Sequence, residues 1–437
     1  MPGGTRASER FTKRVSFVAV VGLVYASTCA GPYGIEEYIA WVGPGLFILL
    51  LFVTPWIWGV PMALAGAELS AYEAVEGGYY RWAHRHLGGF WGFQAGAWSV
   101  IAVFLDNALY PVLFARTVSF VVPGLSGSER WLIAVAVILL LTWINLRGVV
   151  VTGTSAVVLN LFLVAPLIWL CLAAVGQIRL NPVAPFRIGE GGLSAELGIC
   201  LGLALWLYSG YVEVSTASEE IERPERTIPL ALAIVTPLAI LSYALPLVAA
   251  LATVGGWESW RAGELTRVGA ELGGRLLGQW MFVAGLASQC VVFLTYLLWS
   301  SRIVWSMAVD GYLSRWLARL HPRYGTPYRV LGLYALAYAV LVALPFEDLL
   351  VADMWVSGSY ELLVLVTLLR VRRLSTLEPG QFRIPGGRIG LALVVVLPTL
   401  TFSVFLALTA GEHLLLGLGA LLLGPLAYGA ARLRRGP

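Results

Sequence analysis

Residues 27–38 read STCAGPYGIEEY and divide one long apolar run into two parts. VSFVAVVGLVYA precedes them at 15–26, and IAWVGPGLFILLLFVTPWIWG follows them at 39–59. A chain that crosses lipid has to pair its backbone N–H and C=O groups internally, and glycine and proline both oppose helix continuation. The stretch therefore predicts a membrane helix broken in the middle, whose unpaired backbone groups are available to bind a ligand.

The composition places the whole chain in a membrane. Of the 437 residues, 59% are hydrophobic and only 12% are charged, whereas soluble domains carry roughly 25% charged residues. A membrane helix needs about 20 mainly apolar residues. The stretches that meet this requirement are 15–40, 43–69, 90–121, 131–147, 154–176, 195–219, 228–254, 277–309, 329–345, 348–370, 389–409 and 412–431. We therefore predict an all-α membrane protein of about 12 transmembrane helices.

The arginines predict the orientation, because basic residues near helix ends are retained on the cytoplasmic side. With the N-terminus inside, most arginines fall on the inner side of the predicted spans. The outer side receives only Arg130, Arg179, Arg187, Arg261, Arg267 and Arg275. We therefore expect a multi-pass protein of the cell membrane with a cytoplasmic tail at 1–14 and both termini in the cytoplasm. The net charge of +4 follows from this distribution and does not indicate a nucleic-acid partner.

A second interruption lies in the sixth predicted span, five spans after the first. Residues 203–220 read LALWLYSGYVEVSTASEE, and the apolar run stops at Tyr208, Ser209, Gly210 and Tyr211. A single kink is explained equally well by helix packing as by function. Two broken helices at corresponding positions of two five-helix halves instead indicate a transporter with a binding site near the middle of the membrane.

Ionisable residues within spans are costly and are functional candidates for that reason. We select Asp106 in the third span, Glu213 directly after the second break and Glu361 near the middle of the tenth span. Glu36 and Glu37 begin the outer half of the first helix, where we expect a structural role at the positive end of the helix dipole. The aromatic residues Tyr33, Tyr208, Tyr211 and Tyr296 suit the wall of a pocket for a cation.

Other patterns exclude an enzyme and a cofactor. There is no nucleophile elbow, phosphate-binding loop or HExxH helix, and the four cysteines fall in predicted spans without metal-ligand spacing. His84 and His86 lie in EGGYYRWAHRHLG at 76–88, which we interpret as a basic cytoplasmic loop rather than a metal site. Residues 255–276 alternate apolar and charged residues and predict a short helix over the outer face.

Several blocks of sequence resemble one known family. They include GPYGIEE at 31–37, EGGYYRW at 76–82, DNALYPVLF at 106–114 and EEIERPERTIPLAL at 219–232. Together they resemble the amino acid–polyamine–organocation superfamily, and within it the plant-type branch for polyamine and amino acid uptake. The block DNALYPVLF is the most specific of them.

The resemblance implies a leucine-transporter-type architecture with alternating access. Two inverted five-helix repeats would occupy 15–180 and 195–372, and two additional helices would occupy 389–432. It also implies proton-driven uptake, although Ser300 and Ser301 leave a sodium ion open as the coupling ion. Carried over by motif, the substrate-binding residues are Thr28, Gly31, Pro32, Tyr33 and Gly34 on the first broken helix, Tyr208, Ser209, Gly210 and Tyr211 on the second, and Tyr296 on the eighth, with Asp106 in the family's acidic position.

Departures from the branch bear on the substrate. The polyamine carriers would have an acid directly after the aromatic residue that corresponds to Tyr211, where this chain has Val212. They would have a second acid where this chain has Tyr296, and the position of their tenth-helix acid falls near Val364. A polycation needs several spaced carboxylates, so these departures favour an amino acid. A polyamine carrier and an amino acid exchanger are the alternatives. A channel and a membrane enzyme are disfavoured, and the expected partners are a small-molecule substrate and the lipid bilayer.

Overall fold

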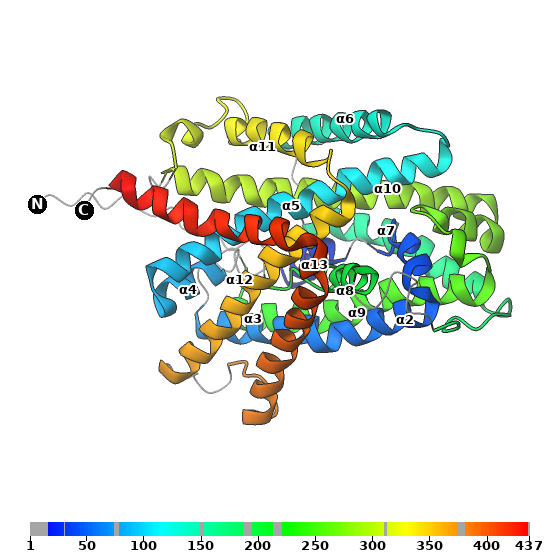
Figure 1. The fold of residues 1–437 in the computed structure, drawn as a ribbon, viewed down its shortest axis with the longest axis horizontal. Helices are drawn as coiled ribbons and strands as arrows, with labels where there is room; N and C mark the ends of the chain where they lie inside the picture. The colour runs from blue at the N-terminus through cyan, green and yellow to red at the C-terminus, as the bar shows by residue number, and fades with distance from the viewer. Residues whose placement is uncertain are drawn as a thin grey trace, which may run out of the picture.

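The computed structural model describes residues 16–29, 31–73, 78–148, 153–186, 195–212, 221–309, 313–374 and 381–435. These residues fold almost entirely into helices (Figure 1), which confirms the predicted class. The α-helices are α1 (Phe17–Thr28), α2 (Ile39–Thr54), α3 (Val60–Tyr72), α4 (Gly78–Leu87), α5 (Gly89–Val121), α6 (Gly127–Leu146), α7 (Gly153–Ala174), α8 (Ala195–Leu207), α9 (Pro224–Thr253), α10 (Glu264–Val309), α11 (Tyr328–Leu341), α12 (Phe346–Leu374) and α13 (Gly387–Arg435). Short helical turns lie at η1 (Glu36–Tyr38), η2 (Pro55–Gly59), η4 (Trp257–Ser259) and η5 (Arg315–Ala318).

Many of these helices are long and apolar enough to cross a membrane. By length and composition, 7 described segments qualify: Glu36–Tyr72, Gly89–Val121, Gly127–Leu146, Arg226–Thr253, Glu264–Arg302, Phe346–Leu374 and Gly387–Ala430. Shorter apolar helices lie at Val158–Ala174, Glu196–Leu207 and Tyr328–Leu341. Every predicted span coincides with one of these segments or with α1. The multi-pass character is therefore confirmed, while the number of twelve crossings stays a prediction.

Both predicted breaks are present. The helix α1 ends at Thr28, the described residues from Gly31 to Ile35 are not helical, and helical structure resumes at Glu36. Gly31 and Gly34 there have φ values of 78° and 92°, which glycine adopts without the steric cost of a side chain. The helix α8 likewise ends at Leu207. Residues 208–212 follow without helical structure, and 213–220, with the candidate Glu213, lie outside the described residues.

Glycines also separate helices that follow one another closely. Gly43 (φ 76°, ψ 159°) divides the outer half of the first broken helix from the rest of α2. Gly274 (φ 81°, ψ 174°) divides the first part of α10 from its long apolar part. That first part falls within 255–276, so the short helix predicted there is confirmed.

The helix α13 contains both of the last two predicted spans. A straight helix of its 49 residues would be roughly 73 Å long, more than twice the roughly 30 Å thickness of a hydrocarbon layer. Figure 1 shows that α13 has two arms that meet at an angle near its middle. The two predicted spans correspond to these arms.

Two boundaries differ from the predictions for identifiable reasons. The helix α6 begins at Gly127, before the predicted start at 131, because Ser126 and Glu129 form a capping box and their polar character conceals the first turn from a hydropathy search. Residues 76–88 were interpreted as a loop, but α4 covers most of this segment. Its buried residues Tyr79 and Trp82 pack toward the bundle, and the Tyr79 ring stacks on Tyr360 of α12 with 5.2 Å between centroids.

The helices that carry the breaks meet at the centre of the bundle. The helix α5 packs along both α10 and α12, while α1 packs against α7 and α9, and α8 against α2, α12 and α13. The Tyr243 hydroxyl of α9 donates to the Thr28 carbonyl at the end of α1, at 3.3 Å. This packing brings the two interrupted segments, which are far apart in sequence, to the same part of the molecule.

Candidate functional site

A cavity of about 60 Å³ lies between the two breaks, which is room for a few water molecules. The first break contributes Thr28, Cys29, Gly31 and Tyr33 to its wall, and the second contributes Leu207, Ser209 and Gly210. Ile35 after the first break and Trp206 of α8 also line it, and the remaining wall comes from α5, α9, α10 and α12. The cavity is therefore placed where sequence analysis predicted a binding site.

The backbone at the first break is open to the cavity because the break contains glycine. A Cβ on Gly31 would lie 3.0 Å from Cε2 and 3.1 Å from Cδ2 of Tyr33, closer than normal carbon contacts. The residue also has a positive φ of 78°, which disfavours any side chain. A larger residue here would displace the Tyr33 ring or change the path of the break.

Asp106 is one of two carboxylic acids that line this cavity. Its side chain is 7% exposed, and Oδ1 accepts hydrogen bonds from Trp206 Nε1 at 2.5 Å and from the Tyr110 hydroxyl at 3.2 Å. Both of these hydrogen bonds from described residues are accepted by the same oxygen, Oδ1. Asp106 thus presents a buried, hydrogen-bonded carboxylate to the cavity.

Asp353 on α12 is the second acid in the wall, and sequence analysis missed it. It is 3% exposed, and Ser357 and Tyr360 follow it on the same side of the helix and also line the cavity. The signal was available, because Asp353 lies within the predicted span 348–370 and obeys the rule that selected Glu361. Glu361 is 1% exposed but does not belong to the cavity wall.

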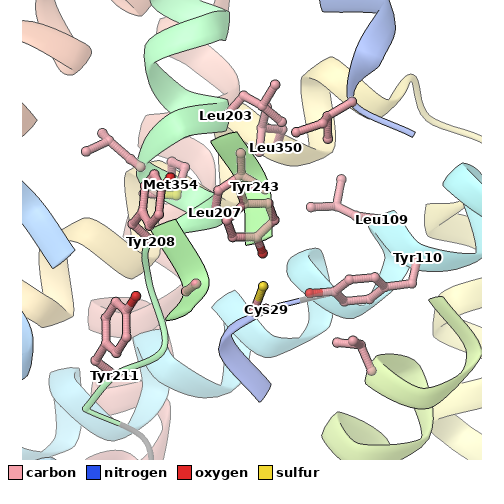
Figure 2. Packing of buried hydrophobic residues seen from close by; sticks show 14 of the residues in the cluster. Cys29, Leu109, Tyr110, Leu203, Leu207, Tyr208, Tyr211, Tyr243, Leu350 and Met354 are labelled. Carbon is pink, nitrogen blue, oxygen red and sulfur yellow. The ribbon is translucent and has the colours of Figure 1, made fainter. Parts of the chain in front are cut away.

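Aromatic rings form much of the remaining surface. They are Tyr33, Tyr110, Trp206, Tyr243, Tyr296 and Tyr360. Tyr110 and Tyr296 stack with 6.3 Å between centroids, and Tyr110 lies 5.8 Å from the Trp206 ring. Figure 2 shows the hydroxyls of Tyr110 and Tyr243 and the Cys29 sulfur pointing toward one another. Such a wall presents ring faces to a cation and hydroxyls to polar groups.

The predicted substrate-binding residues divide into two groups. Thr28, Gly31, Tyr33, Ser209, Gly210 and Tyr296 line the cavity together with Asp106. Pro32, Gly34, Tyr208 and Tyr211 are buried but do not line it. The Gly34 amide donates to Glu36 Oε2 at 2.8 Å, and the Tyr208 hydroxyl donates to the Leu51 carbonyl at 2.9 Å. These contacts turn both residues toward neighbouring elements and away from the cavity.

Other polar residues have structural contacts. Glu36 is fully buried and accepts from the amides of Gly34 at 2.8 Å and Leu265 at 3.4 Å, so it joins the first break to the start of α10. This confirms the structural role expected for it. Ser300 and Ser301 donate to carbonyls of their own helix, at 2.7 Å to Tyr296 and at 3.0 Å to Leu298. Neither serine lines the cavity.

Comparison with known proteins gives consistent matches over nearly the whole chain. The family model described as "Amino acid permease" matches residues 15–413. The polyamine transporter RMV1 of Arabidopsis thaliana is 29% identical over 414 residues, which are 94% of this chain and 84% of the relative. The polyamine transporter PUT1 of Oryza sativa subsp. japonica is 31% identical over 427 residues, which are 97% of this chain and 78% of the relative.

Proposed function

The chain belongs to the amino acid permease family of the amino acid–polyamine–organocation superfamily, and on this premise we propose that it is a secondary active transporter for polyamines. It is a membrane transporter rather than an enzyme. The substrate would occupy the central cavity, which opens alternately to the two sides of the membrane. We propose that both termini lie in the cytoplasm, on the basis of the arginine distribution. The direction we propose is uptake across the cell membrane, as the resemblance to the uptake branch implies.

The observation that carries the substrate assignment is the pair of carboxylates in one cavity. Asp106 and Asp353 come from α5 and α12, and both face a space walled by aromatic rings. Among the described residues that line this cavity there is no arginine, lysine or histidine. Two buried acids in a wall whose described residues include no basic side chain favour a ligand with two ammonium groups, which would balance both negative charges.

This assignment differs from the preference that sequence analysis gave to an amino acid. That preference rested on acids that are absent at Val212 and Tyr296. Asp353 supplies a second carboxylate from a different helix. The two relatives named polyamine transporters add support for the same substrate class.

An amino acid is the second candidate, and a specific observation favours it. The breaks place the open backbone at Gly31 and Gly210 in the cavity wall. Backbone N–H groups at a broken helix can bind a carboxylate, while Asp106 would bind the amine. An exchanger that carries amino acids in both directions would use the same contacts.

We assign the architecture and the coupling ion on the same basis. The paired breaks support two inverted repeats, at 15–180 and 195–372, followed by additional helices at 389–432. We propose a proton as the coupling ion, carried by Asp106, because an intramembrane acid in the cavity wall can alternate between proton and substrate amine. Glu213 and Glu361 are further candidates for this role, and a sodium ion is the alternative.

Thermal stabilisation of the purified protein tests the substrate. We expect putrescine and spermidine to raise the melting temperature in a concentration-dependent manner, because a ligand that binds only the folded state stabilises it. Amino acids, two pH values and a sodium-free buffer complete the panel. Stabilisation by one class of amino acid alone would replace the polyamine assignment with the second candidate.

A further inference from the structure

A single arginine joins three elements at one end of the bundle, outside the central cavity. Arg116 of α5 donates to Glu37 Oε1 at 2.6 Å and to both carboxylate oxygens of Glu347, at 3.1 and 3.2 Å. The Tyr38 hydroxyl donates to Glu347 Oε1 at 2.8 Å. The guanidinium also lies over the Phe346 ring, 5.3 Å from its centroid. We refer to Arg116, Glu37 and Glu347 as the arginine bridge.

The arginine bridge is stronger than an ordinary surface contact. Its side chains are only 22%, 23% and 18% exposed for Arg116, Glu37 and Glu347. Partial burial weakens solvent screening, and a guanidinium that reaches both oxygens of a carboxylate has fixed geometry. Breaking such a pair leaves charged groups with incomplete partners, so the bridge resists opening.

Each element held by the bridge also carries part of the cavity wall. Glu37 follows directly on the first break, whose Tyr33 and Ile35 line the cavity. Arg116 lies ten residues beyond Asp106 on α5, roughly 15 Å along a helix. Glu347 lies six residues before Asp353 on α12, roughly 9 Å. The bridge therefore joins three of the elements that line the cavity, at the end that the predicted topology places outside.

The arginine has space into which it can withdraw. A second cavity, of about 690 Å³, borders Arg116 and is walled by α5, α6 and the turn between α11 and α12. Arg130, Trp131 and Phe346 also line it. The Arg116 side chain can thus leave the two carboxylates without displacing a packed core.

We propose that Arg116 is a positioning residue that holds the outer approach to the central cavity closed, and that it must release Glu37 and Glu347 before substrate passes. The two carboxylates outnumber the guanidinium, so an incoming organic cation is attracted to the bridge and competes with Arg116 for them. The released side chain moves into the adjacent 690 Å³ cavity. This inference rests on the proposed transport function, because only a transporter needs such a closure.

Accessibility of Cys29 tests the closure without measuring transport. Cys29 lines the central cavity and is 3% exposed, and replacing Cys171, Cys200 and Cys290 by alanine leaves it as the reporter thiol. A membrane-impermeant methanethiosulfonate reagent is added to intact cells without substrate. We expect Arg116→Gln to raise the labelling rate of Cys29 about tenfold or more, since removing one partner of a buried charge pair strongly weakens it.

Matched variants separate the closure from a general loss of structure. Arg130→Gln removes an arginine that lines the same 690 Å³ cavity and that has no ion pair among the described residues, so labelling should not change. Glu347→Gln should raise labelling as Arg116→Gln does. The double variant Arg116→Glu with Glu347→Arg should return labelling toward the unsubstituted rate.

The outcomes distinguish this inference from the proposed function. Faster labelling in a protein that transports no amine supports the closure and contradicts the function. Unchanged labelling in both Arg116→Gln and Glu347→Gln, with uptake preserved, overturns the closure and leaves the function standing. Equal acceleration in Arg130→Gln would also overturn it, because the effect would then not depend on the bridge.

Discussion

At the scale of single residues, Asp106 and Asp353 line the same cavity but lie on different helices and have different neighbours. Asp106 is fixed by the Trp206 indole and the Tyr110 hydroxyl, which orient its carboxylate in the cavity wall. Asp353 lines the same cavity from a different helix, α12. We therefore expect the two acids to bind different parts of a substrate.

Asn in place of Asp353 should affect long amines more than short ones. Removing the charge deletes the partner of a second ammonium, and hydrogen bonds to charged groups contribute about 1.5–3 kcal/mol. Asp353→Asn should therefore raise the KM for spermidine uptake roughly tenfold to a hundredfold, with little change for a monoamine. Asp348→Asn, which changes an acid of the same helix outside the cavity wall, is the matched control. Equal losses for both amines would contradict separate roles for the two acids.

The indole of Trp206 offers a second test of the Asp106 geometry. Trp206→Phe removes the donor at 2.5 Å from Asp106 Oδ1 but keeps an aromatic ring. We expect uptake to fall about tenfold, since the carboxylate loses a hydrogen bond to a charged group. Trp280→Phe removes an indole of α10 that donates to the Phe162 carbonyl and should leave uptake unchanged. A similar loss in both variants would indicate a packing effect.

At the scale of elements, hydropathy and glycine predicted different features. Long apolar runs predicted α5 almost to the residue, and the Gly-Pro and Ser-Gly interruptions predicted both breaks. The start of α6 was missed because its capping box is polar. The helix α4 was missed because its buried face, which includes Tyr79 and Trp82, is too short to form an apolar run. Asp353 was missed although it lies within the predicted span 348–370. Contacts between distant helices, such as those of Arg116, are not encoded in any local pattern.

The first break should depend on glycine at Gly31. An alanine there would have a positive φ, which costs roughly 1–2 kcal/mol for a residue with a side chain, and its Cβ would contact Tyr33 at 3.0 Å. Gly31→Ala should therefore lower the melting temperature of the purified protein. Gly419→Ala is the control, because this helical glycine of α13 has no atom within 4 Å of an added Cβ and alanine favours a helix. If Gly31→Ala raised the melting temperature instead, the backbone conformation at this position would not require glycine.

At the scale of the whole molecule, α12 is held at both ends and carries Asp353 between them. Glu347 in its first turn joins the arginine bridge. Arg372 in its last turn donates to both oxygens of Glu68 on α3, each at 2.5 Å, and the Ile384 amide donates to the same carboxylate at 2.7 Å. We refer to this as the inner contact, because the proposed orientation places it on the cytoplasmic side. Glu68 is fully buried, so the inner contact also resists opening. The structure has both contacts formed.

Alternating access requires that these two contacts open one at a time, and this predicts opposite effects of two substitutions. Glu68→Gln weakens the inner contact but keeps a side chain of similar size in its place. We expect it to accelerate Cys29 labelling in inside-out vesicles and to leave labelling of intact cells unchanged, whereas Arg116→Gln should do the reverse. Arg373→Gln, which changes the neighbouring arginine of the same helix end, is the control. Should Glu68→Gln expose Cys29 equally from both sides, the two ends would open together, as in a channel, and alternating access would have to be abandoned.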